Sequence, residues 1–145
     1  MAAKEWDRYI FSHERPYRFE AFDRIRRRLR NEEYWKLFGE LWSDSENLWQ
    51  IENLSNMLHS NRSGREHMMN DEEQFLYEAL PEQFMIYRGH QEINRTGHSW
   101  SLSHSKAKWF AVRYQKSGVV SRVICKKPDA VAILLGRHEW EIIVA

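Results

Sequence analysis

The first half of the chain carries apolar residues at helical spacing, with charged residues between them. Phe22, Ile25 and Leu29 recur at intervals of three and four residues, and a second stripe of this kind runs over residues 34–41. Such stripes are typical of amphipathic helices that pack one face on a core. We therefore expect about three or four short helices over residues 1–80.

Polar residues at several positions predict where these helices begin and end. Ser43 followed by Glu46 resembles a capping box, which predicts a helix that starts there and runs to about Leu58. Asn70, followed by three acidic residues, predicts the start of another helix. Pro81 marks its end, because proline cannot continue a helix.

After Pro81 the pattern changes from helical spacing to alternation of apolar and polar residues, which indicates strands. Strands are expected at residues 84–88, 98–103, 119–127, 130–135 and 137–144. A helix is expected from Ser103 to about Tyr114. The predicted fold class is α+β, with a mostly antiparallel sheet.

The change of pattern also predicts the domain organisation. We expect a helical N-terminal subdomain over residues 1–80 and a β core over residues 81–145, packed as one globular unit.

Composition excludes several classes of protein. The chain has 145 residues, a net charge of +1 and a single cysteine, so it is neither a polycation nor a protein held by an intrachain disulfide. No stretch has the length of a membrane span or the apolar core of a signal peptide. The histidines show no metal-ligand spacing. We expect a cytoplasmic protein without a metal site and without a membrane partner.

Two carboxylates stand close together near the C-terminus. Glu139 and Glu141 are separated by Trp140, and residues two apart in a strand point to the same face. Like charges side by side repel, so folding alone does not require this pair. The pair indicates either a solvated face of an edge strand or a site that uses two acids.

Two further features precede this pair along the β core. Arg88 ends the first expected strand, and Ser99 and Ser101 lie on the second with Trp100 between them. Each feature alone is common by chance, since an arginine at the end of a strand is usually a surface residue. Their joint order along one small β unit is more specific.

Together these motifs resemble the R-S-E class of ADP-ribosyltransferases, a fold shared with many bacterial toxins and phage-encoded modifying enzymes. The resemblance rests on YRG at 87–89, GHSWS at 97–101, AKWFA at 107–111 and EWEIIV at 139–144. It covers roughly residues 80–145, and it implies a compact ADP-ribosyltransferase-like split β core. It also implies that the protein transfers ADP-ribose from NAD, its co-substrate, to a macromolecular target.

The resemblance implies a role for each charged residue. Glu141 would stabilise the positive charge that develops on the ribose of NAD when the bond to nicotinamide breaks. Glu139 would hold or deprotonate the acceptor, and a glutamate at this position favours an arginine acceptor. Arg88 would bind the dinucleotide, because its planar guanidinium suits phosphate.

The remaining residues of the implied NAD site are uncharged. Ser99 would position Glu141 and the nicotinamide ribose, and Ser101 would brace the site. Gly89 and Trp100 complete the residues expected to contact NAD.

An arginine-rich segment at residues 24–30 leaves the target open. Its arginines are expected on the solvated face of a helix, where they either only improve solubility or form a patch for an acidic partner. Arg26 and Arg28 are the target-binding candidates, and the target is a protein or a nucleic acid. Such an enzyme would be a toxin, phage effector or anti-defence protein, and NAD hydrolysis with water as the acceptor is a variant of the same activity. The alternative is a non-catalytic binding module on the same fold.

Overall fold

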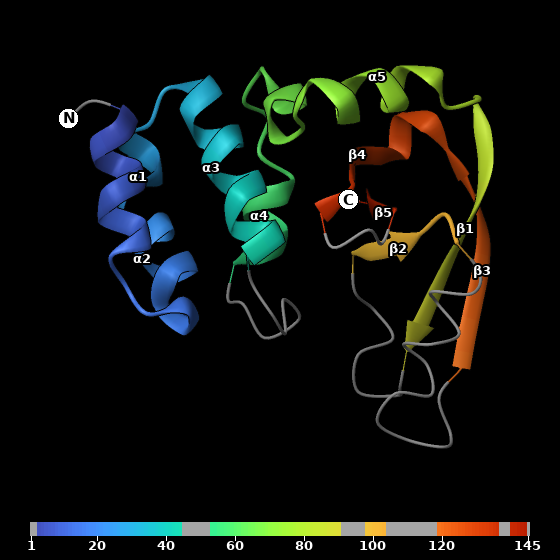
Figure 1. Ribbon diagram of the computed structural model, residues 1–145, viewed down its shortest axis with the longest axis horizontal. Helices are drawn as coiled ribbons and strands as arrows, with labels where there is room; N and C mark the ends of the chain where they lie inside the picture. The colour runs from blue at the N-terminus through green and yellow to red at the C-terminus, as the bar shows by residue number, and fades with distance from the viewer. Residues whose placement is uncertain (1–2, 45–52, 91–97, 104–118, 137–139, 145) are drawn as a thin grey trace. The chain divides into compact units, whose positions relative to one another are not determined.

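The computed structural model describes residues 3–44, 53–90, 98–103, 119–136 and 140–144 (Figure 1). The chain divides into two compact units, Met1–Met68 and Met69–Ala145. Together they contain helices and an antiparallel sheet, which confirms the α+β class. The helix expected after Ser103 falls on residues 104–118, outside the described part.

The first unit is helical and is built around aromatic side chains. Its elements are α1 (Ala3–Phe11), η1 (Arg15–Tyr17), α2 (Arg18–Ile25), η2 (Arg26–Arg28), α3 (Asn31–Asp44), α4 (Leu54–Leu58) and η4 (Arg65–Met68). The predicted apolar stripes are buried, and six aromatic residues form the centre of the core: Phe19, Phe22, Tyr34, Trp35, Phe38 and Trp42. Their rings contact one another at centroid distances of 4.9 to 6.5 Å, mostly edge to face or tilted.

The helix start predicted at Ser43 is wrong. Ser43 lies in the last turn of α3, because the buried residues Leu41 and Trp42 extend the apolar face of that helix to its end. The next described helix, α4, begins only at Leu54, after Asn53 in a left-handed conformation with φ of 63°.

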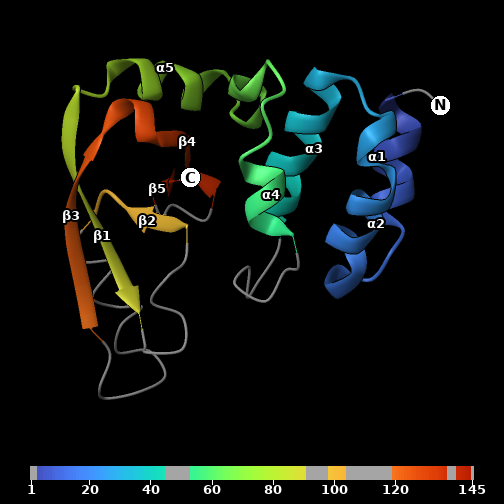
Figure 2. The same cartoon turned by 180° about the vertical axis from the view of Figure 1, so that it is seen from behind.

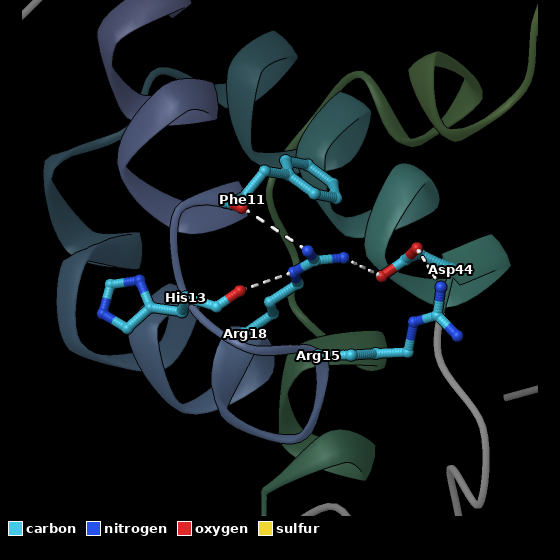
Figure 3. A network of polar contacts seen from close by, with 5 residues as sticks. All are labelled: Phe11, His13, Arg15, Arg18 and Asp44. Atoms are coloured by element: carbon cyan, nitrogen blue, oxygen red, sulfur yellow. Dashed lines mark hydrogen bonds and ion pairs between the residues drawn. The ribbon is translucent and has the colours of Figure 1, made fainter.

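One arginine ties the end of α1 to the end of α3 (Figure 3). Arg18 donates from Nε to the His13 carbonyl at 3.0 Å and from Nη2 to the Phe11 carbonyl at 3.4 Å. Its Nη1 donates to Asp44 at 2.6 Å, and Arg15 lies 3.7 Å from the same carboxylate. The cation therefore satisfies carbonyls at the C-terminal end of α1, where positive charge is favourable.

Gly39 marks a close approach of α3 and η4. A Cβ at this position would lie 2.5 Å from the Met68 carbonyl oxygen and 3.0 Å from its Cα. Alanine favours a helix by about 1 kcal/mol over glycine. Here, however, the obstacle is main chain, and relieving such a clash typically costs about 1–3 kcal/mol or more.

Because the clash outweighs the gain in helix propensity, we expect Gly39→Ala to lower the free energy of unfolding by about 1–2 kcal/mol in urea denaturation. Lys36→Ala, on the exposed side of the same helix, should change it by less than about 0.5 kcal/mol. A Gly39→Ala variant as stable as the wild type would show that α3 and η4 do not pack this closely.

Two carboxyls meet beside a pocket lined by Asp7, Arg8, Phe11 and Glu40. Burial, and then the charge and hydrogen bond of Asp7, raise the pKa of Glu40 to about 7 from its usual 4.5, while Lys36 acts in the opposite direction. The folded state thus holds a proton that the unfolded state releases near pH 4.5. Stability is consequently lost as the pH rises through this interval.

We expect the free energy of unfolding to fall by about 1–2 kcal/mol between pH 5 and pH 8, after allowance for partial exposure. Glu40→Gln should remove most of this fall, because glutamine does not titrate. Urea denaturation of both proteins across this range measures the effect, and an unchanged pH dependence in the variant would contradict it.

The second unit is a five-stranded antiparallel sheet preceded by one helix (Figures 1 and 2). Its elements are α5 (Asp71–Ala79), β1 (Gln83–His90), β2 (Ser99–Ser101), β3 (Val119–Lys126), η6 (Lys127–Asp129), β4 (Ala130–Leu134) and β5 (Glu141–Val144). The strand order is β3-β1-β2-β5-β4. All five strands expected from the alternation pattern are present, and the last begins at Glu141 within the described residues.

Helix α5 belongs to the sheet unit. Asn70 and Glu73 form the capping box that starts it, which confirms the predicted helix start at Asn70. Glu73 also accepts a hydrogen bond from the Leu135 main chain at 2.7 Å, and the Tyr77 hydroxyl donates to the Ala130 carbonyl at 2.9 Å. The boundary between the two units was expected at residues 80–81, after α5. It lies instead before α5, between Met68 and Met69.

Candidate functional site

The sheet order brings the three predicted motif strands together. Arg88 is near the end of β1, Ser99 and Ser101 are on β2, and Glu141 begins β5. These strands are neighbours in the sheet, although their residues are far apart in the sequence. The sheet thus places a guanidinium, two hydroxyls and a carboxylate on adjacent strands.

Ser99 and Glu141 are in direct contact. Ser101 pairs with Glu141 and Ser99 pairs with Ile143, so Ser99 and Glu141 are diagonal neighbours on one face of the sheet. The Ser99 hydroxyl donates a hydrogen bond to Oε2 of Glu141. Both side chains are half-buried, so this bond fixes the carboxylate where it is only partly hydrated.

The side chain of Arg88 binds the main chain of β2. Among the described residues, β1 pairs with β2 at Tyr87 and Ser101, whereas the pairing of β1 with β3 continues to His90. Beyond that single pair, the Arg88 guanidinium donates from Nη1 to the Ser99 carbonyl at 2.7 Å. A side-chain cation therefore contacts β2 just past the last main-chain pair.

Arg88 and Glu141 also interact electrostatically. Burial of the guanidinium lowers the pKa of Arg88, and the negative charge of Glu141 acts in the opposite direction. The arginine remains protonated, because guanidinium groups do not lose their proton in proteins. A positive and a negative group are thus held close together in a partly buried place.

The alternation expected around Glu141 stops at Trp140. Trp140 is 46% exposed and adopts a left-handed conformation with φ of 49°, which is rare for a bulky residue. The strand expected over residues 137–144 therefore does not continue through Trp140, and β5 begins only at Glu141. Glu139 lies outside the described residues, so the face that it shares with Glu141 stays a prediction.

The other expected NAD contacts lie beside these groups. Trp100 pairs with Ile142 across β2 and β5 and is half-buried, and Gly89 pairs with Val120 across β1 and β3. His98, which the sequence did not single out, also contributes. Its Nδ1 lies 2.9 Å from the Val144 carbonyl oxygen and donates to it, so it holds the end of β5.

The two target-binding candidates lie in the first unit and differ in environment. Helix α2 ends at Ile25, and the tighter η2 turn brings Arg26 to within 2.8 Å of Asp23, with 25% of its side chain exposed. Burial raises the pKa of the Tyr34 hydroxyl, and Arg26 acts in the opposite direction. Arg26 is therefore not a solvated surface residue as expected, whereas Arg28 is exposed.

No group of three or more His, Cys, Asp and Glu residues placed to hold a metal ion occurs in the described ranges. Nor does any helix in this part of the chain have the length and apolar character to cross a membrane. Comparisons with protein-family models, with curated proteins and with solved structures give no match.

Proposed function

We propose that the protein is an NAD-dependent ADP-ribosyltransferase whose β unit is an ADP-ribosyltransferase-like split core. One observation carries the proposal: Ser99 binds the Glu141 carboxylate through its hydroxyl and the Arg88 guanidinium through its carbonyl. The serine is the link between the other two groups. These are the residues that the resemblance assigns to the reaction, and they contact one another although they lie on separate strands.

The carboxylate of Glu141 suits the cleavage of NAD. When the bond between nicotinamide and ribose breaks, positive charge develops on the ribose, and a nearby fixed carboxylate stabilises it. The hydrogen bond from Ser99 holds that carboxylate in one orientation, so little reorganisation is needed during the reaction. Glu141 would also accept a hydrogen bond from the ribose 2′-hydroxyl.

Arg88 suits the anionic part of the same substrate. Its cation lies beside Ser99 and close to Glu141, where the phosphate next to the nicotinamide ribose would be. Gly89, Trp100 and Ser101 would complete the contacts with NAD. Glu139 would act on the acceptor.

We expect Arg88→Ala to weaken NAD binding by about 1.5–3 kcal/mol, which is roughly 10- to 150-fold. Arg88→Lys should recover only part of the loss, because an ammonium lacks the planar fork. Calorimetric titration measures both, with Lys126→Ala as a control that removes an exposed cation from β3. Equal NAD affinity in the wild type and in Arg88→Ala would show that Arg88 does not bind the dinucleotide.

The acceptor is proposed to be a macromolecule, with an arginine side chain favoured and a nucleic acid as the alternative. Such an activity would fit a toxin, phage effector or anti-defence protein. Purified protein is incubated with NAD labelled in its adenylate half and with bacterial lysate, and the product is then digested separately with protease and with nuclease. If only one of the two digestions releases the label, that digestion identifies the class of the acceptor. The absence of both labelling and nicotinamide release would contradict the proposal and would favour a non-catalytic binding module.

A further inference from the structure

One row of directly paired residues crosses the whole sheet. Arg122 on β3 pairs with Tyr87 on β1, and Tyr87 pairs with Ser101 on β2. Ser101 pairs with Glu141 on β5, which pairs with Leu134 on β4. Directly paired residues place their side chains on the same face of a sheet. Arg122 therefore shares a face with the proposed catalytic carboxylate.

The exposure of the side chains to solvent increases along this row from β4 to β3. Leu134 is buried at 2% exposure, whereas Glu141, Ser101 and Tyr87 are half-buried and Arg122 is exposed. The row thus has a sheltered end at β4 and β5 and a solvent-facing end at β3. A substrate lying along it would have its reacting bond at the sheltered end.

The charges along the row also differ from end to end. Glu141 is negative, and Arg122 forms no ion pair with any residue of the described ranges. Adjacent strands lie about 4.8 Å apart, so the three steps from β5 to β3 span roughly 14 Å. NAD has matching polarity, since its nicotinamide ribose becomes cationic during cleavage while its two phosphates are anionic.

An exposed apolar pair adjoins Arg122 on the same face. Met85 and Ile124 pair directly with each other, two positions from the pair of Tyr87 and Arg122. Met85 is 38% exposed and Ile124 is 65% exposed. Two neighbouring apolar side chains beside a cation are suited to cover the face of an adenine ring next to a phosphate.

We propose that Arg122 binds the phosphate on the adenosine side of NAD and that Met85 and Ile124 contact the adenine. This inference rests on the proposed function, because it places the nicotinamide ribose at Glu141. Outer strand β3 thus confers preference for a dinucleotide over a mononucleotide.

Calorimetric titration with NAD and with nicotinamide mononucleotide, which lacks the adenylate half, tests this assignment. Arg122→Ala should weaken NAD binding about 10-fold and leave binding of the mononucleotide unchanged. Ile124→Ser should weaken NAD binding a few-fold and should also leave binding of the mononucleotide unchanged. Lys126→Ala removes a cation from the same face of β3, four residues away, and should change neither affinity.

The outcomes separate this inference from the proposed function. Unchanged NAD affinity in Arg122→Ala, with clear binding by the wild type, would overturn the role of Arg122 alone. Equal losses for NAD and for the mononucleotide would overturn it as well, because the effect would not be specific to the adenylate half. Absence of NAD binding by the wild-type protein would overturn the proposed function and this inference with it.

Discussion

Replacing Glu141 by glutamine is expected to slow the release of nicotinamide from NAD about 100- to 1000-fold, the usual cost of losing one group that stabilises transition-state charge. Glutamine has nearly the same shape, and its amide oxygen can still accept the hydrogen bond that Ser99 donates to Glu141. The variant thus removes the charge and keeps the local structure. The rate of nicotinamide release by purified protein measures the effect.

Glu82→Gln provides the matched control, because Glu82 is exposed and immediately precedes β1. It should release nicotinamide at the wild-type rate. Both variants should keep the wild-type melting temperature within a few degrees, since glutamine keeps the shape of each side chain and its hydrogen-bond acceptor. A Glu141→Gln variant that retains more than a tenth of the wild-type rate would argue against a catalytic role for this carboxylate.

Replacing Glu73 by alanine is expected to lower the free energy of unfolding by about 3–6 kcal/mol. Glu73 is only 7% exposed, and its two oxygens accept hydrogen bonds from the main chain of Asn70 at 2.8 Å and of Leu135 at 2.7 Å. Each bond to a charged group contributes about 1.5–3 kcal/mol, and alanine leaves both donors without their acceptor.

This loss is comparable to the whole stability of a marginal domain, which is about 5–15 kcal/mol. Urea denaturation followed by circular dichroism measures it. Glu72→Ala, at the neighbouring exposed position of α5, should cost less than about 1 kcal/mol. Equal effects of the two substitutions would show that Glu73 does not connect α5 to the chain after β4.

The strands of the candidate site were predictable because their information is local. The local pattern of apolar, polar and β-branched residues marks β1, β2 and β5, and the order of Arg88, Ser99 and Glu141 indicates a shared site. What the pattern does not contain is the sheet order, which decides that β1, β2 and β5 are neighbours. The contact between Ser99 and Glu141 follows from that order and from the pairing register.

Three features were missed because they depend on long-range contacts or on rare backbone conformations. Glu73 binds a main-chain group 62 residues away, so periodicity could not assign α5 to the sheet. Trp140 adopts a left-handed conformation within a stretch of strand-forming residues. Arg26 follows a change from helical to 3₁₀ geometry, which rotates it toward Asp23 and away from solvent.

In the proposed mechanism, Glu141 acts on NAD while Glu139 acts on the acceptor. Its most direct test is a paired assay of nicotinamide release and of target labelling with Glu141→Gln and Glu139→Gln. We expect Glu141→Gln to lose both activities. Glu139→Gln should lose target labelling but keep part of the nicotinamide release, because water needs less positioning than a specific acceptor. Equal and mild effects of the two substitutions would contradict it and would indicate two ordinary surface carboxylates.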